Sequence, residues 1–304
     1  MQTVRKIFLP GRTKRGETAL IIHWNNKNIF GKHFMRATDI PTLLLFLFLT
    51  CSCSMIEVHP YDTVVSGEKD INKKNIARIE ASLEGQDSFR FAVISDTQRW
   101  YDETEDAVKA INGRNDIDFV IHCGDQADFG LTDEFMLMRD ILDRLNVPYV
   151  CTIGNHDCLG TGKDVFRELY GPTNFFFTVA DMRFVCMNTN ALEYDYSEPV
   201  PDFNFMQSQL DNMPDNVGRT VFIMHAAPGS DVFNNNVESV FEYYTTLFPG
   251  LQFYLYGHTH ALTVEETSYN GVHYCRYQCP NIKKRVYLLF TVGKNGYEYE
   301  AVEF

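Results

Sequence analysis

Hydrophobic positions follow two alternating patterns between residues 89 and 256. Short apolar runs rich in Phe, Val and Ile, typical of buried strands, alternate with segments whose apolar residues recur at helical spacing. The runs predict strands over 89–95, 117–123, 148–153, 220–224 and 251–256, and a hairpin of 175–180 with 183–188. The intervening segments predict helices over 103–113, 133–146, 164–170, 203–213 and 237–248. This alternation indicates an α/β core.

The pattern changes on both sides of this region. After residue 256 the chain is rich in hairpin signals, including a turn at 293–296, so the core carries either a mixed sheet or a second sheet. Before residue 89, apolar residues at 71, 76, 79 and 83 predict a helix packed on the edge of the core. Residues 54–69 have the composition of a linker.

The first 52 residues predict an export signal rather than a part of the fold. Their apolar run, 43–49, is far shorter than the ~20 residues that span a bilayer. Basic residues precede the run and small residues follow it, as in a signal for export. A buried strand is the alternative, although no other strand pattern lies nearby. The rest of the 304-residue chain is long enough for one domain with a substantial core.

The end of the apolar run resembles a bacterial lipoprotein signal, in which a Cys becomes the acylated first residue. Cys53 is the candidate because a small residue precedes it, and Cys51 is the alternative. Thr50 stands where such signals usually have Leu, and the chain starts at either Met1 or Met35. The resemblance implies export to the bacterial periplasm or cell surface, with membrane anchoring through Cys53.

Charge is distributed unevenly along the chain. Residues 1–52 hold eight Lys and Arg against two Asp and Glu, whereas the remainder holds 19 against 38. An acidic body repels phosphate backbones, so we expect no non-specific nucleic-acid binding. With 45% hydrophobic residues, 11 Pro and 19 Gly, the composition excludes a disordered, collagen-like or coiled-coil protein. Nothing in the sequence sets the oligomeric state.

Six Cys follow Cys53. Three of them, in the strand runs near 123, 151 and 186, are expected to be small core residues. The spacing of Cys275 and Cys279 allows a disulfide in an oxidising compartment, but free thiols are the expectation. The chain has no pair of CxxC motifs, so a structural zinc site of that kind is not predicted.

Five predicted strands end in polar residues that can bind metal. In open α/β sheets, ligands bind beyond the carboxyl ends of the strands. Glycines at 124, 154 and 257 let the backbone turn tightly beside a crowded centre. One edge of the fold therefore collects the following side chains: Asp96 and Gln98, Asp125 and Asp128, Asn155, His156 and Asp157, His225, and finally His258 and His260.

In this order the motifs resemble those of the calcineurin-like metallophosphoesterases, whose pattern is DxH, GDxxD, GNH(D/E), a lone His and GHxH. Residues 89–260 carry all five, with Gln98 in place of the usual His of the first motif. The resemblance implies a two-sheet α/β sandwich with its metal site at the carboxyl ends of the central strands. The resemblance also implies the domain boundaries: residues 1–52 form the signal region, residues 53–88 form a linker and packing helix, and residues 89–304 form the phosphoesterase domain.

The resemblance also implies two divalent metal ions and a small phosphate-ester substrate. A phosphomonoester or phosphodiester would be cleaved by attack of a metal-bridging hydroxide. Each metal would have four ligands, with Asp125 shared, because a carboxylate has two oxygens. The first set is Asp96, Gln98, Asp125 and His260, and the second is Asp125, Asn155, His225 and His258. His156 would protonate the leaving group, Asp128 would orient His156, and Asp157 would hold the loop.

With Gln98, the first site consists of three oxygen donors and one imidazole nitrogen, which is a harder ligand set than one with two imidazoles. This donor set favours Mn²⁺, Fe²⁺ or Mg²⁺, with Zn²⁺ possible. Phe129 stands where calcineurin has Arg directly after GDxxD, so an Arg that grips phosphate would have to come from elsewhere. Residues 99–101, which are Arg99, Trp100 and Tyr101, follow the first motif and are candidates for substrate contacts.

Two other classes of function compete with this interpretation. One is a non-catalytic metal-binding scaffold on the same fold, which would have no need for the proton donor His156. The other is a surface lipoprotein that binds glycans, which would leave the five strand-end motifs unexplained. The Gly-rich stretch 157–164 is not a P-loop, because it lacks the first Gly and the Ser or Thr after Lys163.

Overall fold

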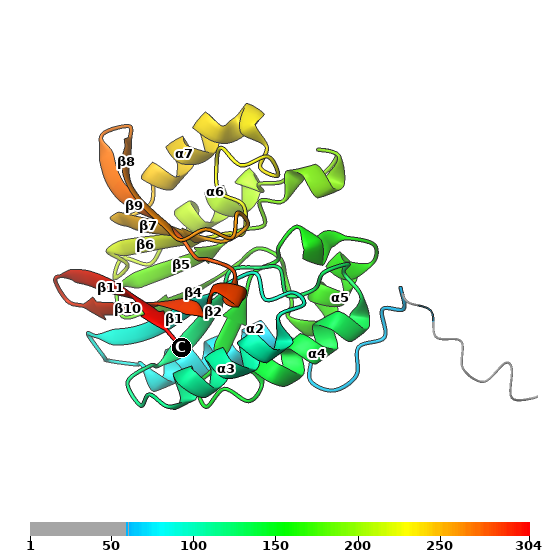
Figure 1. The fold of residues 1–304 in the computed structure, drawn as a ribbon. Coiled ribbons are helices and arrows are strands. Elements are labelled where there is room, and N and C mark those ends of the chain that lie inside the picture. The colour runs from blue at the N-terminus through cyan, green and yellow to red at the C-terminus, as the bar shows by residue number, and fades with distance from the viewer. Residues whose placement is uncertain (1–58, 60) are drawn as a thin grey trace, which may run out of the picture. The chain divides into compact units, whose positions relative to one another are not determined.

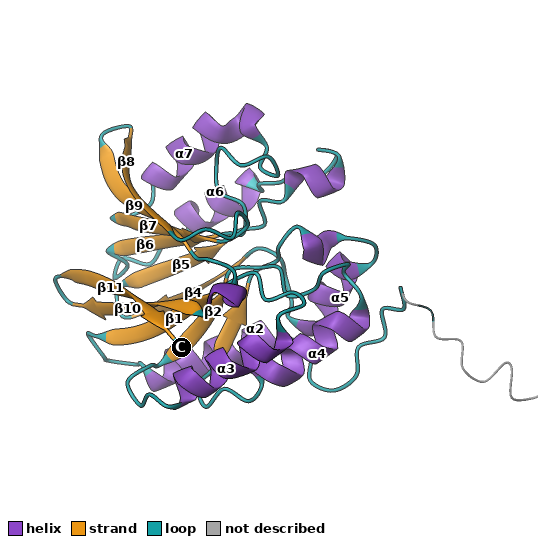
Figure 2. Cartoon of the chain, in the orientation of Figure 1, coloured by secondary structure: helices purple, strands orange, loops and turns teal. Residues whose placement is uncertain are grey.

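The computed structural model describes residues 59 and 61–304. Two β-sheets lie face to face, and helices cover the outer side of each sheet (Figure 1, Figure 2). The two-sheet α/β sandwich implied by the sequence motifs is therefore confirmed. The signal region, with Cys51 and Cys53, lies outside the described residues, and the predicted domain boundaries stay predictions.

The first sheet has the strand order β11-β10-β1-β2-β3. Strands β1 to β3 are parallel, whereas β10 runs antiparallel to both β1 and β11. Helices α3, α4 and α5 pack on its outer face, and α2 lies along its β3 edge. The strands are β1 (Phe89–Ile94), β2 (Phe119–His122), β3 (Tyr149–Cys151), β10 (Val286–Gly293) and β11 (Gly296–Glu303). The helices are α2 (Ile71–Ser82), α3 (Tyr101–Asn112), α4 (Thr132–Leu142) and α5 (Gly162–Leu169).

The second sheet has the order β4-β5-β6-β7-β9-β8. Its four inner strands are parallel, and the edge strands β4 and β8 are antiparallel to their neighbours. Its strands are β4 (Phe175–Val179), β5 (Met182–Cys186), β6 (Arg219–Ile223), β7 (Leu251–Tyr256), β8 (Thr263–Tyr269) and β9 (Val272–Gln278). Its outer helices are α6 (Phe203–Asp211) and α7 (Glu238–Thr246). Short 3₁₀ turns are η2 (His156–Cys158), η3 (Ala191–Tyr194), η4 (Asn235–Val237) and η5 (Ile282–Lys284).

Alternating side chains of the strands build three apolar layers. In β1, Phe91 and Val93 point between the sheets, whereas Ala92 points toward the helices. The Phe91 ring stacks between those of Phe119 and Phe290, at centroid distances of 5.2 and 5.1 Å. Each such ring, fully buried, stabilises the fold by about 1.5–3 kcal/mol. The inter-sheet layer holds the ends of both sheets in a fixed relation, which the site at those ends requires.

Helix α2 closes the open edge of β3 with side chains rather than with another strand. Asn72 accepts a hydrogen bond from the Cys151 backbone N–H and donates one to the Cys151 carbonyl, both at 2.8 Å. Asn75 donates to the Tyr149 carbonyl, also at 2.8 Å. These amides pair backbone groups that an edge strand leaves free. Ile79 of the same helix lies in the inter-sheet layer, so the helix predicted over 71–83 is an integral part of the body.

Several element boundaries differ from the sequence prediction. Helix α3 begins at Tyr101 rather than at 103, and α4 ends at Leu142 rather than at 146. After Leu142 the N–H groups of Arg144 and Leu145 reach back only three residues, to the carbonyls of Ile141 and Leu142, so the α-helix tightens and ends. The tail contributes a hairpin to each sheet, so the core has both a mixed sheet and a second sheet.

The six described Cys are all free thiols, which confirms the expectation for Cys275 and Cys279. Within the part of the chain that the structure describes, every helix is too short or too polar to cross a membrane.

Candidate metal centre

Seven predicted metal ligands meet beyond the carboxyl ends of β1, β2, β3, β6 and β7. Side-chain contacts of 3.1–3.3 Å join Gln98, Asp125, His225, Asn155 and His258 in one group and Asp96 with His260 in another. The backbone N–H of His258 donates to Asp96 at 3.2 Å and connects the two groups. Five loops, whose outermost ligands Asp96 and His260 are 164 residues apart in the sequence, therefore build one cluster. The members are Asp96, Gln98, Asp125, Asn155, His225, His258 and His260.

The second predicted ligand set is assembled around one amide oxygen. The Oδ1 atom of Asn155 lies 3.1 Å from His225 Nε2 and 3.1 Å from His258 Nδ1. His225 Nε2 is also 3.2 Å from Asp125 Oδ2. The far nitrogen of His225, Nδ1, is 2.8 Å from the carbonyl oxygen of Cys123, which orients the ring. Four donors thus point at one small region.

The first set shares Asp125 with the second. Gln98 donates from Nε2 to Asp125 Oδ2 at 3.2 Å, and His260 Nε2 lies 3.3 Å from Asp96 Oδ1. The other amide atom of Gln98, Oε1, is buried and has no hydrogen-bond partner. A buried acceptor without a partner is costly. This oxygen is therefore a suitable donor to a cation, which is the role predicted for Gln98.

The electrostatics of the cluster favour positive charge. Asp96, Asp125 and His225 are buried, and each offers a ligand atom within 4.8 Å of the others'. Burial lowers the pKa of His225, but the Asp125 carboxylate, together with Asp96 and the Cys123 carbonyl, raises it to about 10. Two buried carboxylates this close need compensating cations. Carboxylate and amide oxygens with imidazole nitrogens are ligands of divalent metals, so the residues fit two such ions.

Three glycines make room for these ligands. A Cβ atom added at Gly257 would clash with Ser95 Oγ and Asp96 Oδ2, and one at Gly154 would clash with Asp125. At Gly124 the added atom would lie 2.7 Å from His225 Nδ1, and the φ angle is +95°. The need for glycine at all three positions, predicted from the sequence, is confirmed.

Backbone strain is concentrated in the ligands. Asp96, Asp125, His258 and His260 have φ angles of 52°, 62°, 74° and 61°, a region that side chains other than glycine's rarely adopt. Each costs on the order of 1–3 kcal/mol and persists only where its surroundings enforce it. The fold thus uses strained turns to aim four donors at one point.

Asp157 holds two of the loops together. Its carboxylate accepts hydrogen bonds from the backbone N–H groups of Asp125, Gln126, Ala127 and Gly154, at 2.8–2.9 Å. The loops after β2 and β3 are therefore locked to each other, which agrees with the loop-holding role predicted for Asp157.

His156 stands beside the cluster, and its backbone N–H donates to Asp125 Oδ1 at 3.0 Å. Its ring nitrogen Nδ1 lies 2.8 Å from the backbone carbonyl oxygen of Asp128 and 3.6 Å from the Asp128 carboxylate. That carboxylate instead forms an ion pair with Arg99 Nε at 2.5 Å. Asp128 thus contacts His156 as predicted, but the closer contact comes from its main chain.

The three candidate substrate residues have different surroundings. Arg99 is exposed and reaches the site through Asp128, with Phe129 beneath its guanidinium. Trp100 and Tyr101 are half-buried against the apolar layer under α3, and Lys283 lies over the Trp100 ring. The position of Arg99 suits a substrate contact, whereas Trp100 and Tyr101 mainly pack. Their roles toward a substrate stay predictions.

Two residues near the centre were not predicted. Asp231, on the loop after β6, has Oδ1 2.9 Å from His258 Nε2, the nitrogen that faces away from Asn155. Burial lowers the pKa of His122 to about 3, and its Nε2 contacts Thr97 Oγ1 at 2.8 Å beneath the first motif. No sequence motif marks Asp231, because it approaches His258 only through the fold.

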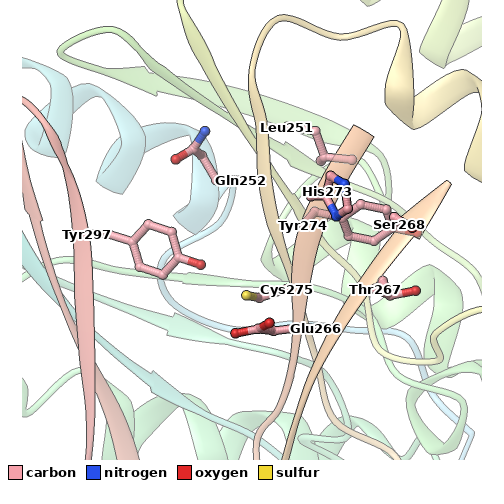
Figure 3. A pocket seen from close by; sticks show the side chains of 9 residues that line it. All are labelled: Leu251, Gln252, Glu266, Thr267, Ser268, His273, Tyr274, Cys275 and Tyr297. Carbon is pink, nitrogen blue, oxygen red and sulfur yellow. The ribbon is translucent and has the colours of Figure 1, made fainter. Parts of the chain in front are cut away.

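A second hollow lies away from this centre. It has a volume of about 480 Å³ and is lined by residues of β7, β8, β9 and β11, among them Glu266, Cys275 and Tyr297 (Figure 3). Its β7 residues, Leu251 and Gln252, belong to the amino end of that strand. None of the predicted site residues lines it, so this hollow is not the predicted site.

Comparison with known proteins gives an independent view of the chain. Residues 89–262 match the family model described as calcineurin-like phosphoesterase. No curated protein matches the chain.

Three solved structures share the fold at low identity. A purple acid phosphatase, PPD1, from yellow lupin (Lupinus luteus) seeds is 12% identical with a TM-score of 0.53, covering 71% of this chain and 51% of its own. A dimetal phosphatase from Danio rerio is 13% identical with a TM-score of 0.51, covering 69% and 98%. PhoD is 10% identical with a TM-score of 0.51, covering 70% and 65%. This chain thus spans about half the length of the lupin phosphatase, and the likeness establishes the fold alone.

Proposed function

We propose that this chain, which belongs to the calcineurin-like phosphoesterase family, hydrolyses small phosphomonoesters or phosphodiesters. The reaction would use two divalent metal ions. The observation that carries the proposal is the convergence of the two predicted ligand sets on Asp125, whose carboxylate contacts Gln98 of the first set and His225 of the second. The unpartnered Gln98 Oε1 supports the inclusion of Gln98. Because that ligand is an oxygen donor, the proposal favours Mn²⁺, Fe²⁺ or Mg²⁺ over Zn²⁺.

Two divalent ions would supply a nucleophilic water of lowered pKa and would offset the charge on the phosphoryl group. The residues of the chain set the geometry. Asp125 has one oxygen near His225 and the other accepting from the His156 N–H, so its carboxylate is held in a fixed plane. The Cys123 carbonyl fixes the His225 ring in the same way. These contacts pre-organise the ligands before any substrate binds.

His156 would deliver the proton that the leaving group needs. Its Nδ1 atom donates to the Asp128 carbonyl, which can only accept, so Nε2 is the nitrogen left to face a departing oxygen. The ring of His156 is partly exposed, which leaves it within reach of a bound substrate. Asp128 and its partner Arg99 hold the loop that carries this carbonyl.

Elemental analysis joined to turnover assays tests the proposal. Purified protein would be stripped of metal, reloaded with Mn²⁺, Fe²⁺, Mg²⁺ or Zn²⁺, and assayed with p-nitrophenyl phosphate and bis-p-nitrophenyl phosphate. We expect about two metal ions per chain and hydrolysis of one or both esters. Full metal loading without turnover of either ester would favour a metal-binding scaffold instead.

We also propose that the protein is exported and anchored through an acylated Cys53. The support is the sequence of residues 1–53, which lie outside the described part of the structure. Expressed in a bacterium, the full chain should partition with membranes, and Cys53→Ala should be released or remain unprocessed. Cys51→Ala is the control, and an effect of that variant alone would move the anchor to Cys51. Soluble protein from every variant would indicate ordinary signal cleavage.

A further inference from the structure

A cavity of about 190 Å³ opens directly beside the metal ligand His258. Its walls come from the loop after β6, residues 227–230, and from the carboxyl end of β7 with its turn, residues 256–259. Arg276 and Gln278 of the neighbouring strand β9 complete it. A group bound in this cavity would lie next to the proposed reaction centre without occupying the metal positions.

Arg276 brings a positively charged side chain to this cavity. Its Nη2 atom donates to the Pro228 carbonyl at 2.6 Å, and its guanidinium lies 5.9 Å from the centre of the Tyr256 ring. Its Nε atom is buried and has no hydrogen-bond partner. Burial and Glu238 raise the pKa of Glu242, and Arg276 offsets only part of that rise. Among residues 59 and 61–304, no carboxylate forms an ion pair with Arg276, although Glu265 of β8 stands opposite it in the strand register and Glu242 lies near enough for Arg276 to lower its pKa.

Such an arrangement is unusual for a protein of net charge −13, in which carboxylates outnumber basic side chains. A guanidinium is charged at every accessible pH and has five N–H donors in a rigid fork that matches phosphate and carboxylate. A buried donor left without a partner is costly. An anion in the cavity would add a direct counter-charge to the guanidinium of Arg276, which lines it.

We propose that Arg276 binds a second anionic group of the substrate, a phosphate or carboxylate on the part of the molecule that is not being hydrolysed. The preferred substrates are then phosphate esters that carry two anionic groups. The proposal rests on the proposed function, since it names the substrate class of the same site. Arg276 lies beyond residue 262, where the match to the family model ends.

Calorimetric binding to metal-loaded full-length protein tests this proposal. The probes are methylphosphonate and a series of ethane-, propane- and butane-bisphosphonates, which contain no ester bond and are not hydrolysed. We expect one bisphosphonate to bind wild-type protein about tenfold or more tightly than methylphosphonate, as a charge-assisted contact predicts. Arg276→Gln should remove most of that advantage, and Arg276→Lys should retain part of it, since Lys keeps the charge but loses the fork.

Arg183→Gln is the matched control. Arg183 also has a buried, unpartnered Nε and bonds one side-chain amide, Gln209, at 3.2 Å, but it lies near the amino end of β5. This variant should keep the bisphosphonate advantage. The proposal is overturned if no bisphosphonate exceeds methylphosphonate on the wild type, or if Arg276→Gln keeps the full advantage.

The binding result and the proposed function can fail separately. Hydrolysis of p-nitrophenyl phosphate without any bisphosphonate advantage would overturn the role of Arg276 and leave the phosphoesterase function standing. An advantage that depends on Arg276, in protein that turns over no phosphate ester, would support the anion site and overturn the hydrolytic function.

Discussion

The Nδ1 atom of His156 lies 2.8 Å from the backbone carbonyl oxygen of Asp128. Because the acceptor is a main-chain atom, the variant Asp128→Asn retains it. The contact also leaves Nε2 as the ring nitrogen that is free to face a substrate. Since neither nitrogen is assigned to a metal, the role of His156 can be tested separately from the metal ligands.

His156→Asn should keep both metals and lose roughly 10²–10⁴ in kcat, the usual range for general acid catalysis. The loss should be smaller on p-nitrophenyl phosphate, whose leaving group needs little protonation, than on an alkyl phosphate. Asp128→Asn, which retains the carbonyl, should lose less. Steady-state kinetics with both ester types decides the point. Equal losses on the two esters would leave His156 with a positioning role only.

Asp125→Asn should abolish the dimetal centre. The substitution removes the negative charge that both ligand sets share, while the side chain keeps its size. We expect metal content to fall well below that of the wild type and turnover to reach background. Asp215→Asn, an exposed loop change, is the control and should leave both unchanged. Normal metal content in Asp125→Asn would rule out the bridging role.

Gln98→His should shift the preference of the first site toward Zn²⁺. An imidazole is a softer donor than the amide oxygen Oε1, which is buried without a partner. The measurement is the ratio of activities with Zn²⁺ and Mn²⁺, together with metal content. An unaltered ratio at full occupancy would show that Gln98 does not bind metal.

Gly257→Ala should damage the first ligand set through steric overlap alone. The backbone at Gly257 is not left-handed, but the new Cβ atom would overlap Ser95 Oγ and Asp96 Oδ2. Overpacking of this kind costs about 1–3 kcal/mol and would move Asp96. Gly293→Ala adds the same atom where nothing lies within 4 Å. Thermal melts and metal titrations of the pair should separate them, and indistinguishable results would contradict the crowding at Gly257.

Asp231→Ala should weaken metal binding although the residue has no place in any motif. Its Oδ1 atom lies 2.9 Å from His258 Nε2 and fixes the ring so that Nδ1 faces Asn155. Removing such a partner typically costs 10–100-fold in metal affinity or activity. Asp231→Asn, which still offers an acceptor oxygen, should recover part of the loss. Metal affinity by competition with a chelator is the readout, and wild-type affinity for Asp231→Ala would exclude this role.

Most ligands of the metal centre can be predicted from the sequence, because each of them follows a buried strand. Apolar runs identify the strands, parallel pairing brings their ends together, and short loops leave little freedom for residues such as Asp96 or His225. The three glycines were predictable for the same reason, since a crowded strand end has room only for hydrogen. The same alternation indicates the α/β core, whereas the two-sheet sandwich came from the resemblance of the motifs to a known family.

What the sequence could not indicate depends on long-range packing. Asp231 reaches His258 only because the loop after β6 folds over the end of β7, and an exposed Asp in a polar loop has no distinguishing pattern. The position of Arg276 could not be predicted either. The sequence of β9 is that of an ordinary hairpin strand, and only its pairing with β7 brings Arg276 beside the centre. The ion pair of Arg99 with Asp128 also joins side chains from two different loops.

The two asparagines of α2 have a practical consequence for anyone who trims this protein. The family match begins at residue 89, yet a chain started there would lose the helix whose amides satisfy β3. The bared strand would offer its free N–H and C=O groups to any other strand nearby. Such a fragment should therefore form aggregates or strand-paired dimers. The homology boundary and the folding boundary of this molecule are about 18 residues apart, measured back to Ile71 where the helix begins.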